Sequence, residues 1–182
     1  MTRASRRFAM AFCAFGWGAL GDDADAQAGR GRVICEITEN GDSASGTVSI
    51  QRDGQEVANA TCGKELSVEA GSYTALVRLD GALDGPSQQK SVAVTSNGKV
   101  SVKADFATGT LEVRIASQGK RAAGMAIIKK NGVQIGTLGS GVAAHLSAGT
   151  YQVFARYRAF EKSLGDVTIG PGQRLALDAA FE

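Results

Sequence analysis

Apolar and polar residues alternate along most of the chain, in short runs separated by turn-forming residues. The run 73–79, for example, places tyrosine, alanine, valine and leucine at every second position. A period of two is typical of a strand that buries one face. Asp53-Gly54 is a favoured hairpin turn, and Asn97-Gly98 is another turn signal. No window keeps a helical period over three turns, so the pattern predicts an all-β fold of the sandwich or barrel type.

The same pattern occurs twice. The segment 69–78, EAGSYTALVR, returns as SAGTYQVFAR at 147–156. The offset of 78 residues also maps Asp53-Gly54 onto Asn131-Gly132, and it falls to 75 residues farther along. A shared frame with one three-residue deletion indicates a duplicated unit. We therefore expect a tandem pair of small antiparallel β-sandwiches of about seven strands each, one at 29–107 and one at 108–182.

Residues 1–28 have the features of a secretory signal peptide. Arg3, Arg6 and Arg7 form a basic start, an apolar run follows at 8–20, and Ala26-Gln27-Ala28 is a small-x-small cleavage pattern. An apolar run of 13 residues is too short to span a bilayer. The sequence thus predicts cleavage after residue 28, a periplasmic or secreted location, and no transmembrane helix in the mature chain.

Removal of 1–28 leaves two cysteines, Cys35 and Cys62. Two cysteines in an exported chain usually pair, so we expect a structural disulfide. It would stabilise the fold by roughly 3 kcal/mol, because it restricts the unfolded chain. The 78-residue frame places Val113 and Ser140 at the equivalent positions of the second copy, which therefore lacks the bridge.

The sequence offers little for catalysis. Its one histidine, His145, lies in a short strand pattern, and a solvent-facing strand residue is the expectation. With the cysteines paired, no set of soft or imidazole ligands remains for a metal. Asp80 and Asp84 flank a glycine-bearing loop but supply only two carboxylates, too few for calcium. We expect no enzyme activity, no metal and no cofactor.

Several segments resemble a known family. The sequences GTLEV at 109–113, AGTYQV at 148–153 and GPGQ at 170–173 resemble PEGA-type repeats and the related carboxypeptidase-regulatory-like, prealbumin-like β-sandwich modules. The resemblance covers 109–182 and, more weakly, 31–106. It implies an extracytoplasmic, non-enzymatic module for adhesion, envelope attachment or protein contact.

The two copies differ in charge and in one predicted face. Residues 30–106 carry 8 Lys/Arg against 10 Asp/Glu, whereas 107–182 carry 9 against 5. In the second copy, alternation predicts that Ile127 and Lys129 face outward, where the first copy has Ser49 and Gln51. Phe154, Arg156 and Arg158 are predicted to face outward beside them. An exposed aromatic with nearby cations is typical of an interaction patch. Packing against the first copy and ordinary surface are the alternatives. The candidate patch is Ile127, Lys129, Phe154, Arg156 and Arg158.

These observations favour an exported, non-catalytic structural or binding module of the cell envelope or extracellular space. Its expected partner is an envelope or extracellular protein, in particular an acidic one. A carbohydrate-binding module is one alternative, although few exposed aromatics are expected. A self-assembling surface or fibre subunit is another. A nucleic-acid partner is not expected for an exported chain with a net charge of +2.

Overall fold

The computed structural model describes residues 29–182. The predicted signal peptide at 1–28 lies outside the described residues. Within 29–182 every regular element is a strand, so the all-β prediction is confirmed. In this part of the chain no helix is long and apolar enough to cross a membrane.

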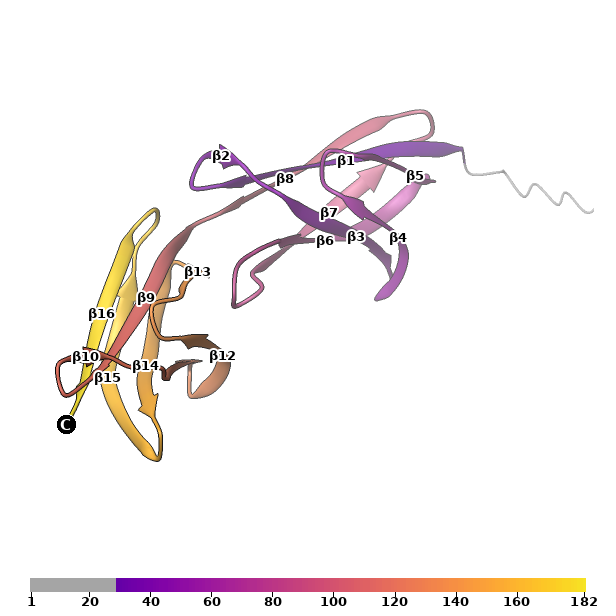
Figure 1. The fold of residues 1–182 in the computed structure, drawn as a ribbon. Helices are drawn as coiled ribbons and strands as arrows, with labels where there is room; N and C mark the ends of the chain where they lie inside the picture. Colours follow the sequence, from indigo (N-terminus) through magenta and orange to yellow (C-terminus); the bar gives the residue numbers. More distant parts are fainter. Residues whose placement is uncertain (1–28) are drawn as a thin grey trace, which may run out of the picture.

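Residues 30–106 form a first β-sandwich, which we call repeat 1 (Figure 1). Sheet A has the order β2-β1-β5, and β8 pairs with the other edge of β1. Sheet B has the order β4-β3-β6-β7. The strands are β1 (Arg30–Glu39), β2 (Asp42–Ser43), β3 (Gly46–Arg52), β4 (Gln55–Thr61), β5 (Glu65–Glu69), β6 (Gly71–Leu79), β7 (Ser87–Val94) and β8 (Lys99–Phe106).

Residues 108–181 form a second β-sandwich, repeat 2, with the same topology. Sheet C has the order β10-β9-β13, with β16 on the other edge of β9, and sheet D has the order β12-β11-β14-β15. The repeats lie end to end, and β8 leads almost directly into β9 (Figure 1). The strands are β9 (Thr108–Ser117), β10 (Lys120–Arg121), β11 (Met125–Lys130), β12 (Val133–Gly139), β13 (Ala143–Ser147), β14 (Gly149–Tyr157), β15 (Phe160–Ile169) and β16 (Arg174–Phe181).

One strand pair in each repeat is parallel, which differs from the purely antiparallel prediction. β1 pairs in parallel with β8, and β9 pairs in parallel with β16. The reason is that β8 enters sheet A from β7 of sheet B, and so reaches β1 by crossing between layers rather than by a hairpin. All other pairs are antiparallel.

Each repeat has its own core between its two sheets. The alternation read from the sequence is the burial pattern of the strands: in β6, Tyr73, Ala75, Val77 and Leu79 are all buried. The largest fully buried side chain is Tyr151, the equivalent of Tyr73 in repeat 2. Burial of one face in two facing layers explains why a period of two dominates the sequence.

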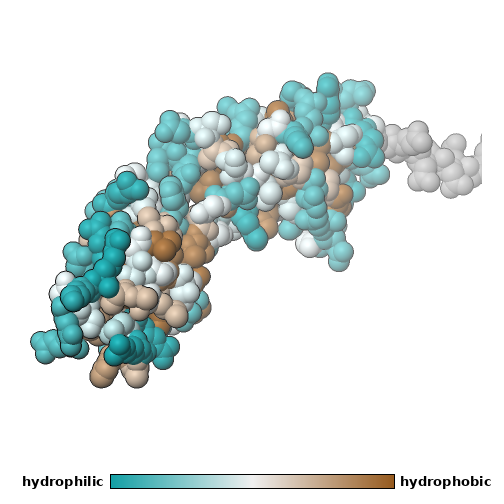
Figure 2. Space-filling view, viewed as in Figure 1, coloured by the Kyte–Doolittle hydropathy of each residue, from teal (hydrophilic) through white to brown (hydrophobic). Residues whose placement is uncertain are grey.

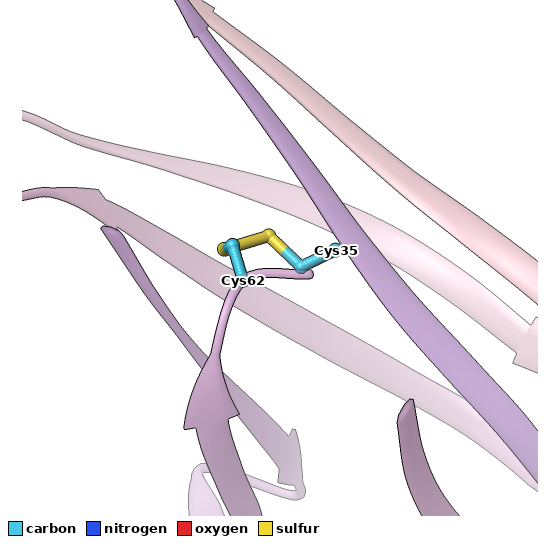
Figure 3. Close-up of a disulfide and its surroundings, with 2 residues drawn as sticks. All are labelled: Cys35 and Cys62. Carbon is cyan, nitrogen blue, oxygen red and sulfur yellow. A yellow bond between two sulfur atoms is a disulfide. The ribbon is translucent and has the colours of Figure 1, made fainter. Parts of the chain in front are cut away.

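Cys35 and Cys62 form the predicted disulfide (Figure 3). Cys35 lies on β1 in sheet A and is fully buried, whereas Cys62 directly follows β4 of sheet B. The bond therefore ties the two sheets of repeat 1 together. In repeat 2 Ser140 stands in the place of Cys62, and its hydroxyl accepts a hydrogen bond from the Ile115 amide of β9 at 2.9 Å.

Candidate functional site

The predicted patch lies mainly on the outer face of sheet D, on the neighbouring strands β11 and β14. Cross-strand register places Met125 opposite Arg156, Ile127 opposite Phe154, and Lys129 opposite Gln152. Such directly opposite residues have adjacent side chains on one face. Four of the five predicted residues are thus brought together by two strands. The Lys129 ammonium lies 4.7 Å from the centroid of the Phe154 ring, in a cation–π contact.

The prediction that Ile127 is exposed was wrong. Ile127 is only 9% exposed, although it does not belong to the main core of repeat 2. Its cross-strand neighbour Phe154 is half-buried, and the two apolar side chains lie side by side on the outer face. The outer face therefore has its own small apolar layer, which an alternation rule cannot foresee.

Arg158 also differs from its prediction. β14 ends at Tyr157, so Arg158 does not continue the outward face of the strand. It lies in the β14–β15 turn with a φ of 53°, and its guanidinium lies 5.0 Å from the centroid of the Tyr157 ring. It is exposed, but at the end of the strand.

Met125 is an exposed apolar residue of this face that was not predicted from the alternation. It is 45% exposed and lies opposite the exposed Arg156. As the first residue of β11, it lies at the edge of the alternating run, where the pattern is weakest. The face that a partner would meet is therefore Met125, Arg156, Lys129 and the half-buried Phe154, with the buried Ile127 beside it; we call it the outer face of repeat 2. Within residues 29–182, no hydrogen bond or ion pair joins Lys129 or Arg156 to another side chain.

The same positions in repeat 1 are more polar. Thr47, Ser49 and Gln51 stand where repeat 2 has Met125, Ile127 and Lys129. Arg78 and Arg156 are equivalent, and both are exposed. The face of repeat 2 is therefore more apolar than the equivalent face of repeat 1, which is more hydrophilic.

The contact between the repeats lies elsewhere, and it involves a loop whose role the sequence did not reveal. Residues 80–86 of repeat 1, between β6 and β7, reach repeat 2; we call them the docking loop (Figure 1). Asp84 accepts hydrogen bonds from the Ser147 amide at 3.0 Å and from the Tyr151 hydroxyl at 2.9 Å. Its carboxylate is also 3.4 Å from the Lys130 ammonium, and its side chain is only 5% exposed.

The docking loop also brings an apolar group. Leu83 packs against the core of repeat 2, and its amide donates to the His145 carbonyl at 2.8 Å. A Cβ built on Gly136 of β12 would come within 2.8 Å of the Leu83 side chain. Any side chain at position 136 would therefore force Leu83 to shift. Figure 2 shows hydrophilic residues over much of both repeats and hydrophobic residues at the surface beside their junction.

Burial alone would raise the pKa of Asp84. The hydrogen bonds from Ser147 and Tyr151 and the charge of Lys130 outweigh it, so the pKa lies below its ordinary value of 3.8. Burial raises the pKa of Tyr151 well above its ordinary value, and the Asp84 carboxylate raises it further. At neutral pH the site therefore holds a carboxylate and a neutral phenol that donates to it.

A second contact joins the repeats around Thr108. The Asn40 side chain accepts a hydrogen bond from the Thr108 amide at 3.0 Å and donates to the Thr108 carbonyl at 3.0 Å. The Thr108 hydroxyl donates to Glu39. His145 Nδ1 is 3.5 Å from the same Glu39 carboxylate, while its side chain is 59% exposed, as predicted for a solvent-facing strand residue. Only Ala107 separates β8 from β9, so two contacts and a very short connection hold the repeats together.

Repeat 1 has no docked loop at the equivalent place. There Arg52 corresponds to Lys130 and donates to the Tyr73 hydroxyl at 2.5 Å. Glu69, in the place of Ser147, lies 3.6 Å from Arg52, so repeat 1 supplies its own carboxylate. Ala58 stands where Gly136 makes room for Leu83. Among residues 29–182, no group of three or more His, Cys, Asp or Glu side chains could hold a metal ion.

Comparisons with known proteins give no family for this two-repeat β-sandwich chain. No family model matches it, and no curated protein matches it. The PEGA-type assignment therefore stays a prediction from residues.

Several solved structures are similar in outline. The Bacillus anthracis TIE protein is 13% identical with a TM-score of 0.39, over 85% of this chain and 34% of its own. A polysaccharide-binding candidate from Bacteroides thetaiotaomicron is 10% identical with a TM-score of 0.44, over 77% of this chain and 80% of its own. A candidate cell adhesion protein from Bacteroides ovatus is 10% identical with a TM-score of 0.38, over 84% and 92%. The chain spans about a third of the first of these proteins.

Proposed function

We propose that the protein is an exported, non-catalytic structural or binding module of the cell envelope or extracellular space. Its outer face of repeat 2 binds a protein partner that carries acidic groups. The observation behind this proposal is the divergence of one face between two copies of the same unit. Thr47, Ser49 and Gln51 are replaced by Met125, Ile127 and Lys129 around an arginine that both copies share.

The chemistry of this face supports an acidic protein partner. Met125 and the half-buried Phe154 supply apolar area at the surface, and covering this area with a partner is favourable. Arg156 and Lys129 flank that area, and an exposed arginine next to an aromatic ring is a common anchor in protein interfaces. The net charge of +4 on 107–182 favours approach of a negatively charged surface.

The test is a binding experiment with two matched variants. The double variant Met125→Ser, Arg156→Glu changes two exposed side chains, so the fold should remain. Phe154 is left intact because it lies beside the buried Ile127. Arg78→Glu, at the equivalent position of repeat 1, is the control. Each purified chain is used as bait for extracts of the producing cell's envelope, and retained proteins are cross-linked and identified.

The expected result is one protein retained by the wild type and by Arg78→Glu but not by the double variant. Light scattering on the same samples distinguishes a foreign partner from self-association. If the wild type forms dimers or larger species that the double variant does not form, the partner is a second copy of this chain. Equal retention by all three chains, without self-association, contradicts the proposal.

A further inference from the structure

An open hollow of about 690 Å³ lies on the outer face of sheet B, in repeat 1. Ser49 and Leu76 form part of its floor, and both are half-buried. Glu56, Asn59 and other residues of β4 line one side. This volume lies in the range of small-molecule binding sites. The hollow is on a different repeat from the proposed protein-binding face and is independent of it.

Cross-strand register arranges polar side chains of the hollow in rows across the sheet. Alternate residues of a strand lie about 6–7 Å apart, so successive rows repeat along the sheet at that spacing. An array of this kind matches an extended ligand with many hydroxyl groups better than a compact one. The rows are Thr61, Thr47 and Arg78; then Asn59, Ser49 and Leu76; then Glu56 and Gln51.

Glu56 is held in place as a hydrogen-bond acceptor. The Ser49 hydroxyl donates to one of its oxygens at 2.5 Å, and the Asn59 amide donates to the other at 2.5 Å. These two hydrogen bonds lower the pKa of Glu56, so the carboxylate stays ionised at neutral pH. Each oxygen keeps a second lone pair, which can accept from a ligand hydroxyl.

The opposite end of the hollow is cationic. Arg78 and Lys64 both line it and are both exposed. Neither side chain takes part in a salt bridge within residues 29–182. A guanidinium without a partner beside hydroxyl and amide groups is suited to a carboxylate on the ligand.

We propose that this hollow binds an acidic oligosaccharide. Sugar hydroxyls donate to Glu56 and bond with Asn59 and Gln51, while a uronate carboxylate pairs with Arg78 and Lys64. Leu76 supplies an apolar floor for the C–H face of a pyranose ring. In repeat 2 the equivalent face carries Phe154 and Ile127 in place of Leu76 and Ser49, so the hydroxyl-binding row is absent there.

The test is a nitrogen-15 NMR titration of the full exported chain with trigalacturonic acid as the probe. Maltotriose, a neutral trisaccharide, and acetate, a simple carboxylate, are titrated in parallel. We expect shifts of the outer-face amides of β3, β4 and β6 with a dissociation constant on the order of 1 mM. Acetate and maltotriose should each bind more weakly. Acetate offers only the carboxylate, and maltotriose offers only the hydroxyl groups.

Two variants and one matched control locate the site. Arg78→Gln should weaken trigalacturonate binding about tenfold by loss of a charge-assisted hydrogen bond. Asn59→Ala should weaken both trisaccharides. Arg156→Gln, the equivalent substitution in repeat 2, should change neither. Absence of shifts on sheet B, equal shifts with acetate alone, or an equal loss in Arg156→Gln would each overturn the proposal.

Discussion

Asp84 is the residue through which the docking loop makes its strongest polar contacts, and Asp84→Ala removes them in one step. The substitution leaves the rest of the loop unchanged, including Leu83. Asp80→Ala is a matched control, because Asp80 lies in the same loop, carries the same charge and is exposed. The two variants therefore differ mainly in whether the lost carboxylate touches repeat 2.

The magnitude follows from the three contacts of Asp84. The Ser147 amide loses this acceptor, and a buried donor without a partner costs about 1–3 kcal/mol. The Tyr151 hydroxyl has one proton, and without Asp84 it can donate that proton to the Ser147 carbonyl 2.7 Å away, so its loss is about 1 kcal/mol. The Lys130 side chain is 37% exposed and returns to water at little cost. The expected loss is about 3 kcal/mol of unfolding free energy, or about 6–12 °C in melting temperature for a chain of this size.

Calorimetry across pH tests both the size and the cause. The pKa of Asp84 in the folded chain lies below 3.8, so its carboxylate stabilises the fold fully above that pH. This stabilisation is lost as the pH falls below 3.8 toward the lower folded value. The difference in unfolding free energy between wild type and Asp84→Ala should thus be constant near neutrality and shrink in acid. The unfolding free energy of Asp80→Ala should stay within about 0.5 kcal/mol of the wild-type value at every pH. Two results would contradict this account of the docking loop: Asp84→Ala melts at the same temperature as Asp80→Ala, or its loss of unfolding free energy is as large at pH 3 as at neutral pH.

Three further predictions test other parts of the structure. Gly136→Ala should cost about 1–3 kcal/mol by displacing Leu83, and the double variant Gly136→Ala, Leu83→Ala should show coupling in a double-mutant cycle measured by thermal unfolding. Reduction of the Cys35–Cys62 bond should lower the stability of repeat 1 by roughly 3–4 kcal/mol, with hydrogen exchange in repeat 2 little changed; equal loss of protection in both repeats would contradict separate cores. Ile127→Asp should destabilise the chain by about 3 kcal/mol or more, whereas Met125→Asp should not; chemical denaturation that finds the two equal would contradict the burial difference.

The strands and their inward faces could be predicted because burial in a two-layer sandwich alternates residue by residue. The run from Tyr73 to Leu79 and its copy from Tyr151 carry that alternation directly. The disulfide was predictable for a different reason, since an exported chain with two cysteines usually pairs them. Neither inference needed knowledge of which strands are neighbours.

The features that were not predicted depend on which strands and loops are neighbours in space. Ile127 is buried because β14 places Phe154 beside it, and the neighbouring strand cannot be read from a local pattern. Asp84 meets residues that lie 46, 63 and 67 positions away. One signal was nevertheless available: the residues that repeat 2 lacks relative to repeat 1 fall in the docking loop. A loop that is longer in one copy than in the other marks a place where the copies differ in role.

The docking contact makes the two copies non-interchangeable. The donor loop exists only in repeat 1, because the β14–β15 connection of repeat 2 is a tight turn. The receiving gap exists only in repeat 2, where Gly136 and Ser147 replace Ala58 and Glu69. A chain with the repeats in reversed order would present a short turn to a site already filled by an alanine and a glutamate. The contact between the repeats can therefore form only with repeat 1 before repeat 2. Each repeat carries one half of a contact that the other repeat cannot supply.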